Sequence, residues 1–215
     1  MSEAMIEKLS VSHYLLQSKA IKLSPSTPFI WASGWKSPIY CDNRKTLAFP
    51  EIRTLICDRF VELITKQFPE VELIAGVATG AIAQGALVAD RMGLPFAYVR
   101  SAPKNHGLEN LIEGEVAAQQ KVVVVEDLIS TGGSSLAAVE ALRKAGCNVL
   151  GMVAIFTYGF PAAENRFRDA GCGLYTLTNY NELLDLALQS HYIEASQLPL
   201  LKQWREAPDR WMQEE

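Results

Sequence analysis

The hydrophobic positions in the first third of the chain recur at helical spacing in two places. The segment from Met5 to Leu23 carries an apolar stripe at this spacing and predicts a helix. A second helix is predicted to begin at Pro50 and to end at Pro69, because its apolar residues return every three or four positions. Between them, residues 29–44 are rich in aromatic residues, Gly and Pro, which favours a hairpin or an extended loop.

Two strand–loop–helix units follow these helices. Each begins with a short apolar run and continues through a small-residue loop into a helix that a glycine ends. Alternation of strands and helices predicts an α/β fold with a parallel twisted sheet that helices cover on both faces. The predicted elements are a strand and helix within Leu73–Met92, a short strand Phe96–Val99, a valine strand from Val122, a helix from about Ser134 to Ala145, a strand Val149–Phe156, and one or two amphipathic helices within residues 179–207.

The stretch from Val122 to Ser135, VVVVEDLISTGGSS, combines the groups that a ribose phosphate needs. Two carboxylates, Glu126 and Asp127, are predicted at the strand's C-terminal end, where they suit sugar hydroxyls or magnesium. Backbone N–H groups of the following glycine-rich helix start suit a phosphate. The simpler alternative is two solvated carboxylates and a turn with an N-capping serine. Because no Lys follows the glycines and no GxGxxG is present, neither a P-loop nor a dinucleotide fingerprint is indicated.

Two further loops belong to the predicted carboxyl edge of the sheet. The Thr79-Gly80 pair can offer N–H groups to a diphosphate, or can simply cap a helix. The long segment 101–120 is predicted to be a functional lid or disordered. Arg100, Lys104 and His106 lie at its start and can close over a diphosphate, unless they are only a solvated charged loop. His106 can also give a proton to a leaving oxygen.

The segment from Ser33 to Tyr40, SGWKSPIY, has groups that can line the pocket of a flat aromatic ligand. Tyr40 can stack on such a ligand, and Lys36 can pair with an anionic group on it. The alternative is a hydrophobic hairpin packed on the core.

Composition limits the class of protein. At 215 residues the chain fits one domain, and its net charge of −4 argues against non-specific binding to nucleic acid. No apolar run approaches the ~20 residues of a membrane span, and the first residues lack a secretion signal. We therefore expect a cytoplasmic protein. The cysteines have no CxxC spacing and are predicted to be small core residues; they are Cys41, Cys57, Cys147 and Cys172.

Taken together, these motifs resemble those of a known family. VVVVEDLISTGGSS resembles the 5-phosphoribosyl diphosphate (PRPP) motif of type I phosphoribosyltransferases. Residues 29–44 and Val99–Gly107 are similar to the shorter bacterial members of the orotate phosphoribosyltransferase family, and so is the C-terminal segment with Trp204 and Trp211. The resemblance spans nearly the whole chain.

The resemblance implies a fold and a reaction. The chain would be one domain, with an N-terminal hood at about residues 1–48, a core at about 50–175, C-terminal helices at about 179–215 and a mobile loop. It would use Mg²⁺ to transfer the phosphoribosyl group of PRPP to orotate in pyrimidine synthesis, with the metal held mainly through PRPP. The family is also a homodimer whose loop reaches into the neighbour's site, so Lys104 would serve the partner chain.

The resemblance also implies roles for individual residues. Lys104, His106 and Asp127 would act in catalysis, and orotate would be bound by Ser130, Lys36 and Tyr40. The residues implied in PRPP binding are Arg100, Lys104, His106, Glu126, Asp127, Leu128, Ile129, Ser130, Thr131, Gly132, Gly133 and Ser134.

The chain departs from the family pattern at several cations. Where many members carry lysine, it has Ser101 and Ala102 just after the loop arginine. It also has Ala32 and Gly80 where one subgroup carries lysines. The set of cations around a diphosphate is therefore smaller than in those members.

Two other functions fit parts of the pattern. A transferase for another base, such as a purine, would share the PRPP motif, although residues 29–44 argue against it. A PRPP-sensing regulatory protein without turnover would be expected to carry a DNA-binding helical appendage or a basic RNA-binding face, and the sequence shows neither.

The lid hypothesis makes one prediction. Lys104→Ala is expected to lower turnover far more than substrate binding, because the ammonium group would stabilise charge that develops on the leaving diphosphate. Steady-state rates together with PRPP titration measure the two effects. Unchanged turnover in this variant would refute the assignment of the loop as a lid.

Overall fold

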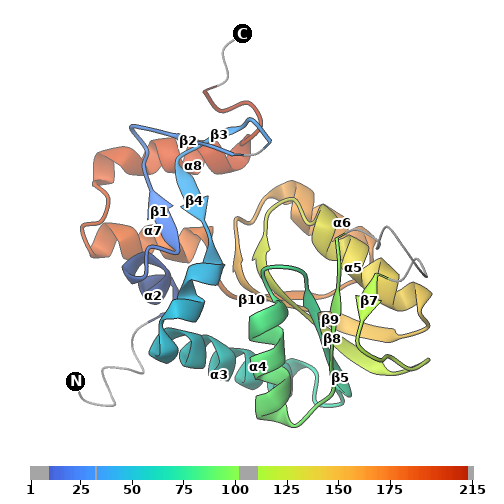
Figure 1. Ribbon diagram of the computed structural model, residues 1–215. Helices are drawn as coiled ribbons and strands as arrows, with labels where there is room; N and C mark the ends of the chain where they lie inside the picture. The colour runs from blue at the N-terminus through green and yellow to red at the C-terminus, as the bar shows by residue number, and fades with distance from the viewer. Residues whose placement is uncertain (1–9, 32, 102–110, 213–215) are drawn as a thin grey trace.

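The computed structural model describes residues 10–31, 33–101 and 111–212, and its centre is a twisted sheet (Figure 1). The sheet has six strands in the order β10-β9-β8-β5-β6-β7. All neighbouring pairs are parallel except the edge pair β6–β7, so the predicted parallel sheet is confirmed with one antiparallel strand added. The strands are β5 Leu73–Val77, β6 Phe96–Val99, β7 Ile112–Glu113, β8 Lys121–Ile129, β9 Asn148–Thr157 and β10 Leu174–Asn179.

The valine run of β8 is buried on both faces of the sheet. Val122 and Val124 pack with residues of the α5 side, whereas Val123 and Val125 pack with residues of α3 and α4. Each of these four valines is fully buried. The run is uninterrupted by polar residues because β8 is an inner strand, and its successive side chains alternate between two apolar layers.

The helices that cover the sheet largely follow the predicted pattern. α3, Pro50–Gln67, has proline in its first turn, and it ends just before Pro69. α4, Ile82–Met92, ends at Gly93, whose positive φ of 64° suits glycine. α5, Gly133–Lys144, covers the other face. α6, Pro161–Asp169, was not predicted, because only Ala163 and Phe167 of its residues are buried and its sequence carries little apolar signal.

The N-terminal region differs from its prediction. The described helix, α2, runs only from Val11 to Gln17, and Ile21–Leu23 forms strand β1 instead. The prediction of a helix to residue 23 was therefore wrong, because Ile21–Leu23 pairs antiparallel with β4, Ile39–Cys41. For residues 29–44, a hairpin or an extended loop was predicted, and the structure has a hairpin of β2, Phe29–Ile30, and β3, Lys36–Ser37. A 3₁₀ helix, η1 Asn43–Ala48, leads into α3.

The N-terminal elements up to η1 and the C-terminal helices form one layer beside the sheet, and we call this whole layer the hood. In Figure 1 the blue strands β1–β4 lie beside the red helices α7, Tyr180–Gln189, and α8, Leu198–Glu206. The fully buried ring of Trp204 joins the ends, with its centroid 5.6 Å from Trp31 and 5.5 Å from Tyr158. Two C-terminal helices are thus confirmed, and they complete the hood built by the N-terminal strands.

Two further properties of the described part of the chain concern its environment. No helix there is long and apolar enough to cross a lipid bilayer. All four cysteines are free, and Cys57, Cys147 and Cys172 are buried as predicted. Cys41 is the exception, because it lines a cavity.

Candidate active site

A polar cavity of about 520 Å³ opens at the carboxyl ends of β5 and β8. Ligands of open parallel sheets bind at this edge, because loops and helix N-termini meet there. The hood supplies one wall of the cavity, and the loops after β5 and β8 supply the others. Its lining residues are Cys41, Asp42, Arg44, Val77, Ala78, Thr79, Gly80, Ser101, Glu126, Asp127, Leu128, Ser130, Thr131, Gly132, Ser134 and Ser135.

The two predicted carboxylates both line this cavity, but they do not stand at a strand end. β8 continues through Ile129, so Glu126 and Asp127 lie within it. Glu126 follows the face of Val122 and Val124 and accepts a hydrogen bond from Ser135 Oγ of α5 at 2.8 Å. Its other oxygen accepts from the backbone N–H of Asp127 at 3.0 Å. The prediction that the strand ends at these two residues was therefore wrong.

Asp127 follows the opposite face and packs against the loop after β5. A Cβ atom placed on Gly80 would lie 2.2 Å from Asp127 Oδ2, so any side chain at position 80 would displace the carboxylate. The backbone carbonyl of Asp127 accepts a hydrogen bond of 2.6 Å from Asn43 Nδ2 of the hood. Asp127 is thus held between the sheet, the first loop and the hood. The adjoining Ala78–Thr79 peptide bond is cis.

Burial changes the protonation of the carboxylate pair. Desolvation, followed by the nearby charge of Asp127, raises the pKa of Glu126 to about 8. Burial also raises the pKa of Asp127, and hydrogen bonding with Glu126 and the charge of Arg44 act against this rise. The pair therefore retains a proton near neutral pH, and the positive charge of Arg44 favours Asp127 as the ionised member.

The loop after β8 has the form of a phosphate cradle. Gly132 adopts a φ of +79°, and α5 starts at the next residue, so the amides of this bend point out of a helix N-terminus. Arg166 Nη1 of α6 donates to the carbonyl of Thr131 at 3.0 Å and supports the bend. Two residues expected to bind PRPP, Ile129 and Gly133, are not among those that line the cavity.

Ile129 is fully buried, and its carbonyl accepts from the backbone N–H of Tyr158 at 3.2 Å. It therefore supports the loop from below. The predicted residues that do line the cavity here are Leu128, Ser130, Thr131, Gly132 and Ser134.

A second, more apolar cavity of about 280 Å³ adjoins the first. The two share Cys41, Leu128 and Ser130, so a ligand can extend from one into the other. The remaining lining residues of the second cavity are Ile30, Trp31, Tyr40 and Tyr158.

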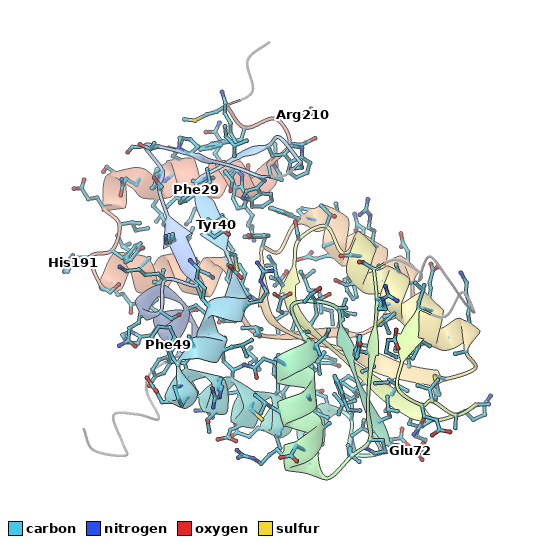
Figure 2. The ribbon with its side chains drawn as sticks, in the orientation of Figure 1. Phe29, Tyr40, Phe49, Glu72, His191 and Arg210 are labelled. Atoms are coloured by element: carbon cyan, nitrogen blue, oxygen red, sulfur yellow. The ribbon has the colours of Figure 1, made fainter. Side chains whose placement is uncertain are left out.

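Tyr40 was predicted to stack on a flat ligand, and its side chain lines this second cavity. Figure 2 labels it in the hood with Phe29, and their ring centroids are 5.7 Å apart. Lys36 does not line the cavity, but the β2–β3 register places it opposite Ile30, so both side chains lie on the same face of that ribbon. Trp31 and Tyr158 were missed, because only the fold brings them together.

The predicted cations are placed only in part. Arg100 Nη1 lies 3.5 Å from Glu113 Oε1 of β7, and the next residue, Ser101, lines the polar cavity. Lys104 and His106 lie outside the described residues, as do Ala32 and Ala102.

Comparison with known proteins identifies the family. Residues 49–189 match the phosphoribosyl transferase domain family. An orotate phosphoribosyltransferase of Porphyromonas gingivalis is 60% identical over 94% of this chain and 96% of its own. This chain belongs to the orotate phosphoribosyltransferase family. Among solved structures, the orotate phosphoribosyltransferase of Aeropyrum pernix is 27% identical, with a TM-score of 0.74 over 86% of this chain and 99% of that one.

The fold by itself does not select the acceptor base. An adenine phosphoribosyltransferase structure covers 79% of this chain, and its own chain is covered completely, with a TM-score of 0.63 and 22% identity. At that identity the likeness concerns the fold alone. The resemblance of residues 29–44 to orotate phosphoribosyltransferases therefore carries information that the sheet does not.

The raised pKa of Glu126 predicts a pH dependence of stability. Between about pH 4.5 and about pH 8 the folded protein keeps a proton that the unfolded chain releases. The free energy of unfolding should therefore fall as pH rises through this window. Glu126→Gln should remove this part of the fall, which is roughly 5 kcal/mol at most for a shift of that size. Urea denaturation of the ligand-free protein across the window measures it.

A matched control is Glu62→Gln, since Glu62 is exposed and pairs with Arg59 on α3. It should leave the pH dependence of the wild-type protein unchanged. Equal pH dependence in Glu126→Gln and wild type would show that Glu126 ionises normally in the folded state.

Proposed function

We propose that this chain transfers the 5-phosphoribosyl group from PRPP to orotate, forming orotidine 5′-phosphate and diphosphate in the synthesis of UMP. The observation that carries the proposal is the pair of joined cavities. One is polar and combines a phosphate loop with two carboxylates, and the other is apolar and lined by aromatic rings. Family membership supports the same substrates.

The reaction can be assigned to the residues of the two cavities. The amides of Thr131 to Ser134 hold the 5′-phosphate at the start of α5. Asp127 accepts hydrogen bonds from the ribose hydroxyls and fixes the anomeric carbon near Ser130, where the cavities meet. A ring nitrogen of orotate then bonds to this carbon as the bond to the diphosphate oxygen breaks.

Charge develops at both ends of the breaking bond. The sugar becomes more positive and the leaving diphosphate more negative, so the ionised carboxylate of Asp127 near the sugar and cations near the diphosphate stabilise the transition state. Lys104 and His106 are proposed to supply cations from the loop, and His106 can protonate the leaving oxygen. Arg100 adds a charge at the base of the loop.

Magnesium is proposed as the cofactor. Within the described ranges, no three His, Cys, Asp or Glu side chains gather as a metal site. The carboxylate pair can supply only part of a set of oxygen ligands, so PRPP itself would complete it. The bound ion would neutralise charge on the diphosphate oxygens.

The second cavity suits orotate. Its aromatic walls, including Tyr40, fit a flat ring, and Ser130 at the junction can hydrogen-bond the ring. Orotate is anionic, and Lys36 on the face of Ile30 is proposed to pair with its carboxylate. A purine lacks this negative charge, which favours orotate as the acceptor.

The setting of the enzyme is also proposed by analogy with the family. We infer a homodimer in which the loop of one chain serves the neighbouring site. We also infer a cytoplasmic location, which the free cysteines favour.

A spectrophotometric assay of orotate consumption tests the function. We expect consumption that depends on PRPP and is lost without magnesium, and no comparable product with adenine, guanine or hypoxanthine. Preference for a purine would instead support a transferase of another class of base. No detectable phosphorolysis of orotidine 5′-phosphate would support a regulatory protein.

A further inference from the structure

The charges around the polar cavity are unbalanced for the substrate it is proposed to hold. Three described lining residues are acidic, namely Asp42, Glu126 and Asp127. Among the described lining residues, Arg44 is the one with a positive charge. PRPP carries several negative charges, so its diphosphate requires cations at short range. Arg100, the described cation of the loop base, lies beside Glu113.

Arg44 is positioned by its neighbour in the hood. Its Nε donates to Asp42 Oδ1 at 2.7 Å. The Asp42 side chain is 16% exposed and the Arg44 side chain 58% exposed, so a largely sheltered carboxylate orients an accessible guanidinium. The hydrogen bond from Arg44 lowers the pKa of Asp42, which keeps the pair ionised. The planar guanidinium has further N–H groups suited to phosphate oxygens.

The surroundings of Arg44 indicate which end of PRPP it faces. The charge of Arg44 acts on Asp127, and Asp127 packs on Gly80. Gly80 belongs to the loop after β5, whereas the amides for the 5′-phosphate lie in the loop after β8. Arg44 does not line the apolar cavity. It therefore lies toward the end of the polar cavity that the 5′-phosphate and the base do not occupy.

We propose that Arg44 binds the diphosphate group of PRPP and, in the reverse reaction, inorganic diphosphate. This inference rests on the proposed function. The hood thus contributes a phosphate-binding cation as well as the base pocket. The preceding residue, Asn43, donates to the carbonyl of Asp127, so the cation and the ribose-binding carboxylate are held in one unit. Neither Gly80 nor Ser101, which lie at the same end, supplies a charge.

Arg44→Gln and Arg44→Lys test the proposal in the full-length enzyme. The probes are PRPP with magnesium, inorganic diphosphate in the reverse reaction, ribose 5-phosphate and orotate. For Arg44→Gln, the Kd of PRPP and the KM of diphosphate should rise about 10- to 100-fold, as expected for lost charge-assisted hydrogen bonds. The values for ribose 5-phosphate and orotate should change less than about twofold. Arg44→Lys should recover part of the loss.

Arg59→Gln is the matched control, because Arg59 forms a similar ion pair with Glu62 on the exposed face of α3. It should change none of the four values, and thermal melting verifies that each variant is folded. Unchanged PRPP binding in Arg44→Gln would overturn the proposal. An equal loss for ribose 5-phosphate would place Arg44 at the 5′-phosphate, and a selective loss for orotate would place it at the base. Weaker PRPP binding would support the proposal even if the wild type used another base.

Discussion

The arrangement of the candidate active site depends most on β8, in which two adjacent acidic residues are buried near the carboxyl end of the strand. Four valines of β8 pack alternately into the two apolar layers that cover the sheet. Because this alternation continues along the strand, the next two side chains, Glu126 and Asp127, point to opposite faces. Glu126 is turned to α5, and Asp127 is turned to Gly80 and the hood. Burying two carboxylates so close together is unfavourable unless they have hydrogen-bond partners. Ser135 and backbone amides donate such bonds, and the positive charge of Arg44 favours the ionised form of Asp127.

The hood stabilises this arrangement from the opposite side. Trp204, from near the C-terminus, packs among Trp31, Tyr158 and Tyr180, so both ends of the chain form one aromatic cluster. The Asn43–Asp127 hydrogen bond then joins the hood to β8. The proposed base pocket, which the hood lines, is thereby fixed in position relative to the proposed ribose site. A small displacement of such groups is costly in a reaction that requires in-line geometry.

Much of this could be predicted from sequence, because its signals are local. The valine run, the glycine bend and Pro50 are signals that depend only on neighbouring residues, and they predicted β8, the bend that leads into α5, and α3. What failed depends on distant partners. Ile21–Leu23 continues an apolar stripe but becomes a strand because β4 lies beside it. β10 and α6 are only partly buried and carry weak periodicity.

The site shows the same division between local and distant information. Local motifs singled out Tyr40 and Ser130, and both residues line the apolar cavity. The opposite orientations of Glu126 and Asp127, by contrast, required knowing that β8 continues to Ile129. Arg44 was inside a recognised segment, but nothing local distinguishes it from a solvated arginine. The role proposed for it rests on the cavity that it lines and on its hydrogen bond to Asp42, which only the fold shows.

The central claim is that the bend from Thr131 to Ser134 holds the 5′-phosphate while Asp127 holds the ribose hydroxyls. A crystal structure of the enzyme with PRPP and magnesium tests it most directly. We predict the 5′-phosphate within hydrogen-bond distance of these amides and the ribose diol on the carboxylate of Asp127. A structure with PRPP bound elsewhere, or with the bend empty and Asp127 turned away, would contradict the account.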